Sequence, residues 1–327
     1  MKTRRPTNPD AEAILGGYFP VLDHGFVSLV DYMGGDDDVE RAARVSYGYG
    51  TRTQSRTRGL VRYLRRHRHT TPSEMVELKF HCAMPMFVAR QWIRHRTANV
   101  NEYSGRYSLM PLLFYTPDAE HFSLQSEVNN QGRGAQAAEE VRRTAVERWD
   151  ALRRDSGALY ESLLEQDVAR ELARIDLPLS TYTQWYWKID LHNLLHFLTL
   201  RVDSHAQYEI RVYAEIMAAM VRRVAPLSYE AWVDYDLAGR PLSRGERRAL
   251  SRLLTSDGSG GLAPTGFGLA EQDLAECGLS GREVREFVAK MAAPEVPDFD
   301  LDLSTMRTAD DMAALIEEAV PERSSSD

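Results

Sequence analysis

Apolar and polar side chains alternate most regularly over residues 75–83. The apolar positions are Val76, Leu78, Phe80 and Cys82, and the polar positions between them are Glu77, Lys79 and His81. Because successive side chains of a strand point to opposite faces, this pattern predicts a strand that is buried on one face. Residues 181–187 are rich in threonine, tyrosine and tryptophan, a composition that favours a second strand.

Several segments have patterns typical of helices. Pro85 cannot donate to a strand ladder, so we expect a helix from Met86 to about His95, with Gln91, Arg94 and His95 on one face. Residues 36–45 open with acidic residues, which suit the positive end of a helix. The other predicted helices are 136–174, with a break near Ser156-Gly157, and a long helix from about Leu191 to Val224 with a buried stripe of Leu191, Leu194, Leu195, Leu198 and Val202.

Proline and glycine positions suggest how the chain is divided. We expect a flexible leader over 1–19, a main α/β domain over 20–240 and a C-terminal extension over 241–327. The extension contains a Gly/Ser-rich connector, Thr255–Gly261, and a predicted helix over 280–292; its last residues, 324–327, are expected to be disordered. All chemically interesting positions precede the connector, so residues from about 256 onward are expected to be dispensable for chemistry.

Composition excludes several classes of protein. The 327 residues are 27% charged and 43% hydrophobic, as in soluble globular proteins, and the net charge of −8 argues against a general nucleic-acid binder. Two cysteines are too few for a disulfide framework. No apolar stretch reaches the roughly 20 residues of a membrane span, and no signal-peptide core is evident. A cytoplasmic protein that binds no membrane is therefore expected.

Arginines are concentrated where the first predicted strand ends. The stretch from Arg90 to Arg106 contains four arginines, a histidine and a serine within 17 residues. One guanidinium group can bind two phosphate oxygens at once. Several arginines close together repel one another unless an anion neutralises their charge. A solvated basic face is the alternative, but Trp92 and Ile93 within the run favour burial. The pattern predicts an anion-binding site.

The spacing of Arg94-His95-Arg96 and Ser104 resembles the signature of the flavin-dependent thymidylate synthases. Further blocks resemble this family in the same order: Leu22-Asp23-His24-Gly25-Phe26-Val27, Arg41-Ala42-Ala43-Arg44-Val45-Ser46, His69-Thr70-Thr71-Pro72, Ala173-Arg174-Ile175-Asp176-Leu177-Pro178 and Leu200-Arg201-Val202-Asp203-Ser204-His205-Ala206-Gln207. Together they cover roughly residues 20–235. The resemblance implies an α/β fold of the α+β type, with a mainly antiparallel sheet flanked by long helices, in a homotetramer with shared active sites.

The resemblance also implies an activity and its partners. The enzyme would convert dUMP to dTMP, with methylenetetrahydrofolate as carbon donor and FAD, reduced by NADPH, as hydride source. The implied dUMP contacts are Glu102, Tyr103, Ser104, Gly105 and Arg106 of one subunit and Gln91, Trp92, Ile93 and Arg94 of another, with Arg174 and Arg201. The implied FAD contacts are Thr71, Arg94, His95, Arg96, Glu102, Asp190, Leu191, His192 and His196. The loop of His67 and His69 would lie against the flavin. Asp190 departs from the family, where asparagine is commoner.

Arg201 is the residue we expect to activate the pyrimidine. In the family this arginine meets the pyrimidine edge, where a permanent positive charge would favour negative charge on N3 and push electron density to C5. A structural ion pair with Asp203 or Glu209 is the alternative. The apolar phase of Cys82 favours an inert cysteine rather than a nucleophile. Ser104 has no base nearby in sequence and is expected to position phosphate or ring.

Two other classes of function remain open from sequence. A non-catalytic module could bind nucleotide or single-stranded nucleic acid, with Trp92, Tyr103 and Tyr107 as stacking surfaces, although the acidic net charge opposes this. A histidine-metal hydrolase could use His192 and His196, which stand one helical turn apart. No third ligand is evident in the sequence, so we expect no metal.

Overall fold

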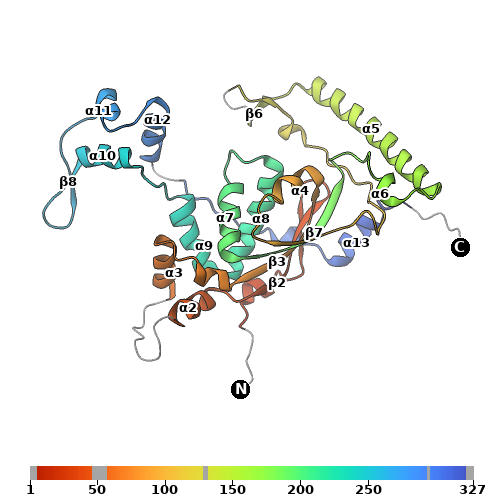
Figure 1. Ribbon diagram of the computed structural model, residues 1–327, viewed down its shortest axis with the longest axis horizontal. Helices are drawn as coiled ribbons and strands as arrows, with labels where there is room; N and C mark the ends of the chain where they lie inside the picture. The colour runs from red at the N-terminus through yellow and green to blue at the C-terminus, as the bar shows by residue number, and fades with distance from the viewer. Residues whose placement is uncertain (1–5, 46–56, 128–131, 293–294, 322–327) are drawn as a thin grey trace, which may run out of the picture. The chain divides into compact units, whose positions relative to one another are not determined.

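The computed structural model describes residues 6–45, 57–127, 132–292 and 295–321. Contacts divide the chain into two compact units, the first comprising residues up to 230 and from 299 onward, the second comprising residues 231–298. The framework of the first unit is a five-stranded sheet (Figure 1). Its strands are β1 (Tyr18–Val21), β2 (Gly25–Met33), β3 (Glu77–Pro85), β4 (Asn99–Glu102) and β7 (Tyr182–Asp190).

The sheet has the order β1-β2-β3-β7-β4, and every neighbouring pair is antiparallel. The two predicted strands are β3 and β7, which pair along their whole length, with Cys82 opposite Trp185 and Phe80 opposite Trp187. The predicted mixed fold, an antiparallel sheet with flanking helices, is confirmed for the described residues.

An aromatic cluster joins one face of this sheet to the helices above it. Those helices are α4 (Met86–Trp92), α7 (Leu191–Arg201) and α8 (Tyr208–Val224). Trp92 is fully buried, with ring centroids 5.2 Å from Phe197, 5.3 Å from Trp185 and 5.8 Å from Tyr213. Aromatic burial of this extent is among the largest stabilising contributions a single side chain makes. The end of α4, where the arginine cluster begins, is therefore fixed to the sheet.

Two predicted helix boundaries were wrong. The long helix expected over 191–224 is two helices, because the Asp203 side chain accepts the backbone N–H of His205 at 2.8 Å and so holds a turn between α7 and α8. Conversely, α5 (Glu139–Glu165) runs without a break through Gly157. A Cβ atom at Gly157 would lie 3.3 Å from Leu112, so this glycine serves close packing rather than a helix end.

The remaining elements of the first unit are short. They are α1 (Pro9–Glu12), α2 (Asp36–Arg44), α3 (Thr57–Arg66), the 3₁₀ helices η2 (Thr71–Met75), η3 (Ala119–His121) and η5 (Leu303–Thr305), β5 (Ser123–Gln125), β6 (Arg133–Gln136), α6 (Arg170–Ala173), α13 (Ala309–Glu317) and α9 (Pro226–Trp232), which runs to the unit boundary. Among the described residues, no helix combines the length and apolar character that a membrane span requires.

The segment expected to be a flexible leader is folded where the structure describes it. Asn8 caps α1, and its backbone N–H donates to the Tyr32 hydroxyl at 2.9 Å. Ala11 and Ile14 are fully buried. Pro9 stands at the start of α1, and Gly16, with a positive φ, forms the turn that follows the helix. Together they direct the apolar side chains of this segment into the core.

The second unit has its own small core. It contains the π-helical turn η4 (Val233–Leu237), α10 (Arg244–Leu253), β8 (Leu254–Ser256), β9 (Leu262–Pro264), α11 (Glu271–Glu276) and α12 (Gly281–Lys290), which matches the helix predicted over 280–292. The core residues are Ala249, Leu274, Cys277, Leu279 and Phe287. The segment Thr255–Gly261, expected to be a connector, instead forms the tip of the β8–β9 hairpin, where the Asp257 side chain accepts two backbone N–H groups.

The end of the chain returns to the first unit, and its expected dispensability for chemistry stays a prediction. Arg307 forms an antiparallel bridge with Tyr18, and Met312 of α13 packs against Phe26 and Ala83 on the sheet. The backbone N–H of Leu112 donates to the carbonyl of Ala319 at 2.8 Å. The compact units thus divide at 230 and 298 rather than at 240, whereas residues 324–327 lie outside the described residues.

The packing of α13 gives a prediction about stability. Met312→Ala should lower the free energy of unfolding by about 2 kcal/mol, because it removes a buried side chain from the Phe26–Ala83 contact. Leu315→Ala, an exposed position of the same helix, should change it by less than about 0.5 kcal/mol. Urea titrations at fixed protein concentration measure both values. Equal effects of the two substitutions would mean that α13 does not pack on the sheet.

Candidate functional site

The arginine cluster lies at the end of α4, on a short path from β3 to β4. The N-terminal backbone of α4 is tied to the segment before β7, since Met86 N–H donates to the Thr181 carbonyl at 2.9 Å. The side chain of Trp92 points into the core, so Ile93, Arg94 and Arg96 are exposed at the helix end. Burial of the Trp92 side chain anchors this helix end, and the predicted contact of Trp92 with the nucleotide stays a prediction.

Arg201 and His95 meet at the centre of the candidate site. The Arg201 Nε donates to His95 Nε2 at 3.0 Å, and the His95 ring stands edge-on to Phe197 with centroids 4.8 Å apart. Burial, with further contributions from Arg201 and His196, lowers the pKa of His95 to about 4. His95 is therefore neutral at physiological pH, with Nε2 as acceptor and its proton on Nδ1.

The alternative that Arg201 serves a structural ion pair is not favoured by the geometry. Asp203 accepts from the His205 ring at 2.8 Å, and Glu209 is buried, where it accepts from Tyr115 and Arg133. Both carboxylates are thus engaged elsewhere. Burial lowers the pKa of Arg201, although a guanidinium remains charged at neutral pH. Arg201 presents a half-buried positive charge whose nearest hydrogen-bond partner is a neutral ring.

A second group of site residues lies in the loop after β4. Glu102 accepts from the Thr183 hydroxyl at 2.9 Å, and Tyr103 N–H donates to the Gln184 carbonyl at 2.8 Å. The loop is thereby pinned to β7. The Ser104 hydroxyl accepts the backbone N–H of Arg106 at 3.3 Å, which holds a turn. We use the name nucleotide loop for residues 102–106.

Gly105 brings Arg174 next to this loop. A Cβ atom at Gly105 would lie 2.7 Å from the Met110 sulfur and 3.1 Å from Cδ of Arg174, so a larger residue here would require these side chains to move. Arg106 pairs with Glu171 at 2.9 Å, and both side chains are more than half exposed. An exposed pair of this kind is weak, so an anion can displace Glu171 at small cost. In the described chain, no hydrogen bond or ion pair joins the nucleotide loop to Arg201.

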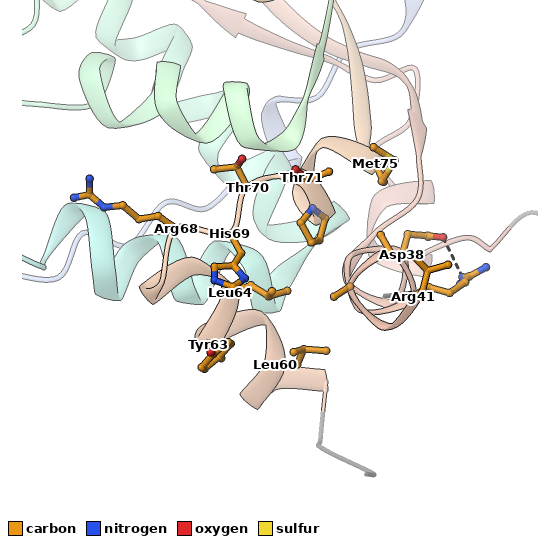
Figure 2. A pocket seen from close by; sticks show the side chains of 14 residues that line it. Asp38, Arg41, Leu60, Tyr63, Leu64, Arg68, His69, Thr70, Thr71 and Met75 are labelled. Carbon is orange, nitrogen blue, oxygen red and sulfur yellow. Dashed lines mark ion pairs between the residues drawn. The ribbon is translucent and has the colours of Figure 1, made fainter. Parts of the chain in front are cut away.

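A separate cavity of about 980 Å³ lies between α2, α3 and η2 (Figure 2). Among the expected FAD contacts, only Thr71 lines it, together with His69 from the loop expected near the flavin. Sequence reasoning assigned no role to Arg41, Tyr63 or Arg68, which also line it. The block that contains Arg41 was a signal for this cavity, and its last residue, Ser46, lies outside the described residues.

The structure explains the unusual Asp190. This residue is the N-cap of α7, where its two carboxylate oxygens accept the Asn193 backbone N–H at 2.9 Å and the Asn193 side chain at 2.7 Å. An aspartate suits the positive end of a helix at least as well as asparagine does. Leu191 is fully buried and its N–H donates to the Val76 carbonyl, so its contribution is packing.

The two histidines of α7 are accessible at the surface of the protein. His192 is partly exposed and His196 is exposed, four residues further along the same helix. No group of three or more histidine, cysteine, aspartate or glutamate side chains within the described residues could hold a metal ion. Within the same residues, no ion pair neutralises Arg94 or Arg96, which are both exposed. This part of the site is a cationic surface suited to an anionic ligand.

Neither cysteine is placed to act as a nucleophile. Cys82 is fully buried on β3, and burial raises the pKa of its thiol well above the ordinary value. A thiol in this setting is protonated and has no access to substrate. Cys277 is buried in the core of the second unit.

Comparisons with known proteins show the family of this chain. Residues 28–227 match the family of the thymidylate synthase complementing protein. The flavin-dependent thymidylate synthase of Ruegeria pomeroyi is 51% identical over 293 residues, which is 87% of this chain and 91% of the relative, and that of Wolbachia pipientis is 52% identical over 258 residues, which is 78% and 90%. The crystal structure of the UMP/dUMP methylase PolB from Streptomyces cacaoi, bound with 5-Br dUMP, matches with a TM-score of 0.60 and 32% identity, over 66% of this chain and 97% of that chain.

The antiparallel sheet, the exposed arginines and the half-buried Arg201 define an α/β protein with a cationic candidate site. The chain belongs to the family of the thymidylate synthase complementing protein, whose curated relatives are flavin-dependent thymidylate synthases.

The low pKa of His95 predicts a specific pH dependence of stability. The unfolded chain binds a proton at its ordinary pKa near 6.5, whereas the folded protein resists protonation down to about pH 4. Stability is therefore fully present above pH 6.5 and is lost as pH falls toward 4. Urea midpoints at pH 7.5 and pH 5.0 should differ less in His95→Gln than in the original protein. The same difference in both proteins would contradict the depressed pKa.

Proposed function

We propose that this protein methylates dUMP to dTMP, with methylenetetrahydrofolate as carbon donor and NADPH as the source of electrons for bound FAD. The observation that carries the proposal is the contact between Arg201 and neutral His95 in a site lined by exposed arginines. The curated relatives bear the name flavin-dependent thymidylate synthase, and the solved relative PolB holds 5-Br dUMP.

The nucleotide loop is suited to hold the phosphate and ring of dUMP. Arg106 can exchange its exposed contact with Glu171 for a phosphate, and Arg174 lies against Gly105 in the same region. The Ser104 hydroxyl can donate to an incoming oxygen while it accepts from Arg106 N–H. These contacts act equally on substrate and transition state, so they supply affinity rather than rate.

Arg201 is suited to activate the pyrimidine. Its charge is half-buried, so water screens it less than it screens an exposed arginine. A guanidinium beside N3 and its neighbouring carbonyl stabilises the negative charge that accompanies nucleophilic attack by C5. Because His95 is neutral, it orients Arg201 without repelling it, and the orientation is in place before substrate binds.

The residues expected to hold FAD fit an anionic cofactor in the features the structure describes. Arg94 and Arg96 are exposed cations, and His192 and His196 lie along one side of α7. Thr71 and His69 line a cavity large enough for part of such a molecule. When bound, FAD would supply the hydride that reduces the transferred one-carbon group. Asp190 contributes by capping α7, which orients the two histidines.

The burial of both cysteines supports a route without an enzyme thiol. A thiolate addition to the pyrimidine would require Cys82 to leave the core and ionise. Electrostatic activation by Arg201 needs neither step. The non-catalytic module is less well supported, because Trp92, one of its stacking surfaces, is fully buried.

We further propose that the active sites of a homotetramer are shared between subunits. Within the described part of one chain, the nucleotide loop and Arg201 form two groups that no hydrogen bond or ion pair joins. Convergence of several arginines on one anion is readily achieved when two chains each supply part of the site.

Two substitutions separate activation from binding. Arg201→Lys keeps the charge but loses the planar fork, so turnover should fall by about 10²–10³ while dUMP binding weakens modestly. Arg106→Ala should mainly raise the KM for dUMP. Arg211→Lys, on the surface of α8 and paired with Glu215, is the matched control and should keep normal turnover. Normal turnover by Arg201→Lys in steady-state assays would disprove its activating role.

Mixed oligomers test the shared site. At a dUMP concentration well below the raised KM of Arg106→Ala, the Arg201→Ala and Arg106→Ala proteins should each be nearly inactive. Co-expression should restore about a quarter of the activity, because each of two contributing chains is intact half the time. Hybrids are verified by mass spectrometry of differently tagged subunits. If verified hybrids stay inactive while hybrids of each variant with the original chain retain activity, both residues act from one chain and the shared arrangement is wrong.

A further inference from the structure

The end of the chain contacts the strand and loop that form the proposed dUMP site. Ile316 of α13 lines a small cavity together with Tyr103, Thr183 and Gln184. Tyr103 belongs to the nucleotide loop, and Gln184 accepts the Tyr103 N–H. Thr183 donates to Glu102, the first residue of that loop. One apolar side chain therefore packs where the nucleotide loop is attached to β7.

A second contact holds the chain that leaves the nucleotide loop. Leu112 N–H donates to the Ala319 carbonyl at 2.8 Å, one residue before Leu113 accepts from Tyr182 N–H at 2.9 Å. The C-terminal part of the chain that supplies Ala319 is itself fixed to the sheet. It forms a bridge from Arg307 to Tyr18, and its Met312 side chain is buried against the sheet. The C-terminal segment, residues 299–319, thus lies between a rigid support and the return path of the loop.

This segment lies outside the part of the chain that defines the family. The family match ends at residue 227, and PolB matches over 97% of its own length while it covers only 66% of this chain. The segment is therefore additional to the match that defines the family, and its contacts with the nucleotide loop point to an effect on binding.

We propose that the C-terminal segment is a positioning element that holds the nucleotide loop in the conformation that binds dUMP. This inference rests on the proposed function of that loop. If the segment releases the loop, only a fraction of the molecules is ready to bind dUMP, and the apparent affinity is reduced to that fraction of its original value. Chemistry after binding is expected to be unchanged, because no hydrogen bond or ion pair among the described residues joins Arg201 or His95 to the segment.

The test uses substitutions at Ile316 in the full-length, FAD-loaded protein. Ile316→Ala should raise the KM and the dissociation constant for dUMP about fivefold and leave kcat within about twofold. Ile316→Leu should restore most of the affinity, because it keeps the apolar volume. Leu315→Ala, on the exposed side of α13, is the matched control and should behave as the original protein does.

Hydrogen exchange gives a second readout that does not depend on activity. Backbone amides of residues 102–112 should exchange faster in Ile316→Ala, and at the original rate in Leu315→Ala. If Ile316→Ala does not fold, Ile316→Val should show a smaller change in the same direction. Unchanged dUMP affinity and unchanged exchange in a folded Ile316 variant would overturn the inference. If the original protein binds no dUMP, the proposed function fails, whereas the exchange rates still decide whether the segment holds the loop.

Discussion

The burial of Trp92 is the constraint on which the rest of the site depends. Its ring packs against Trp185 of β7, Phe197 of α7 and Tyr213 of α8, and these contacts hold α4 against the sheet. With α4 fixed, the following residues must emerge at the surface, where Arg94 and Arg96 are exposed and His95 turns toward Arg201. The core thus determines where the cationic groups stand, and a substrate meets them already in place.

Electrostatics then determine what this arrangement can do. Carboxylates elsewhere neutralise many arginines of the chain, as Glu209 does for Arg133. At the site, Arg201 instead donates to a neutral histidine, and Arg106 is held by a weak exposed pair. The positive potential is therefore available to an anionic nucleotide. A half-buried guanidinium of this kind stabilises charge that develops on a pyrimidine without a covalent bond to the enzyme.

Sequence alone predicted the parts of this structure that depend on local patterns. The alternation over residues 75–83 identified β3, and the motif spacing identified the arginine cluster, because both signals are short in range. Contacts between distant segments left no such signal. The packing of Ala11, Ile14 and Met312 on the core, the role of Asp203 in dividing α7 from α8 and the cavity between α2 and η2 all depend on tertiary structure. For the same reason, the motif could not show that Trp92 and Leu191 face inward while Arg94 faces outward.

The central claim is that an arginine-lined site and bound flavin suffice for methylation without an enzyme thiol. A single-turnover experiment with the Cys82→Ala, Cys277→Ala double variant tests it most directly. The flavin-loaded variant is reduced with NADPH without oxygen, and dUMP and methylenetetrahydrofolate are then added while absorbance and dTMP are followed. If no enzyme thiol is needed, the flavin is reoxidised and dTMP forms in an amount comparable to that of the original protein. A folded, flavin-loaded double variant that is reduced but forms no dTMP would contradict it.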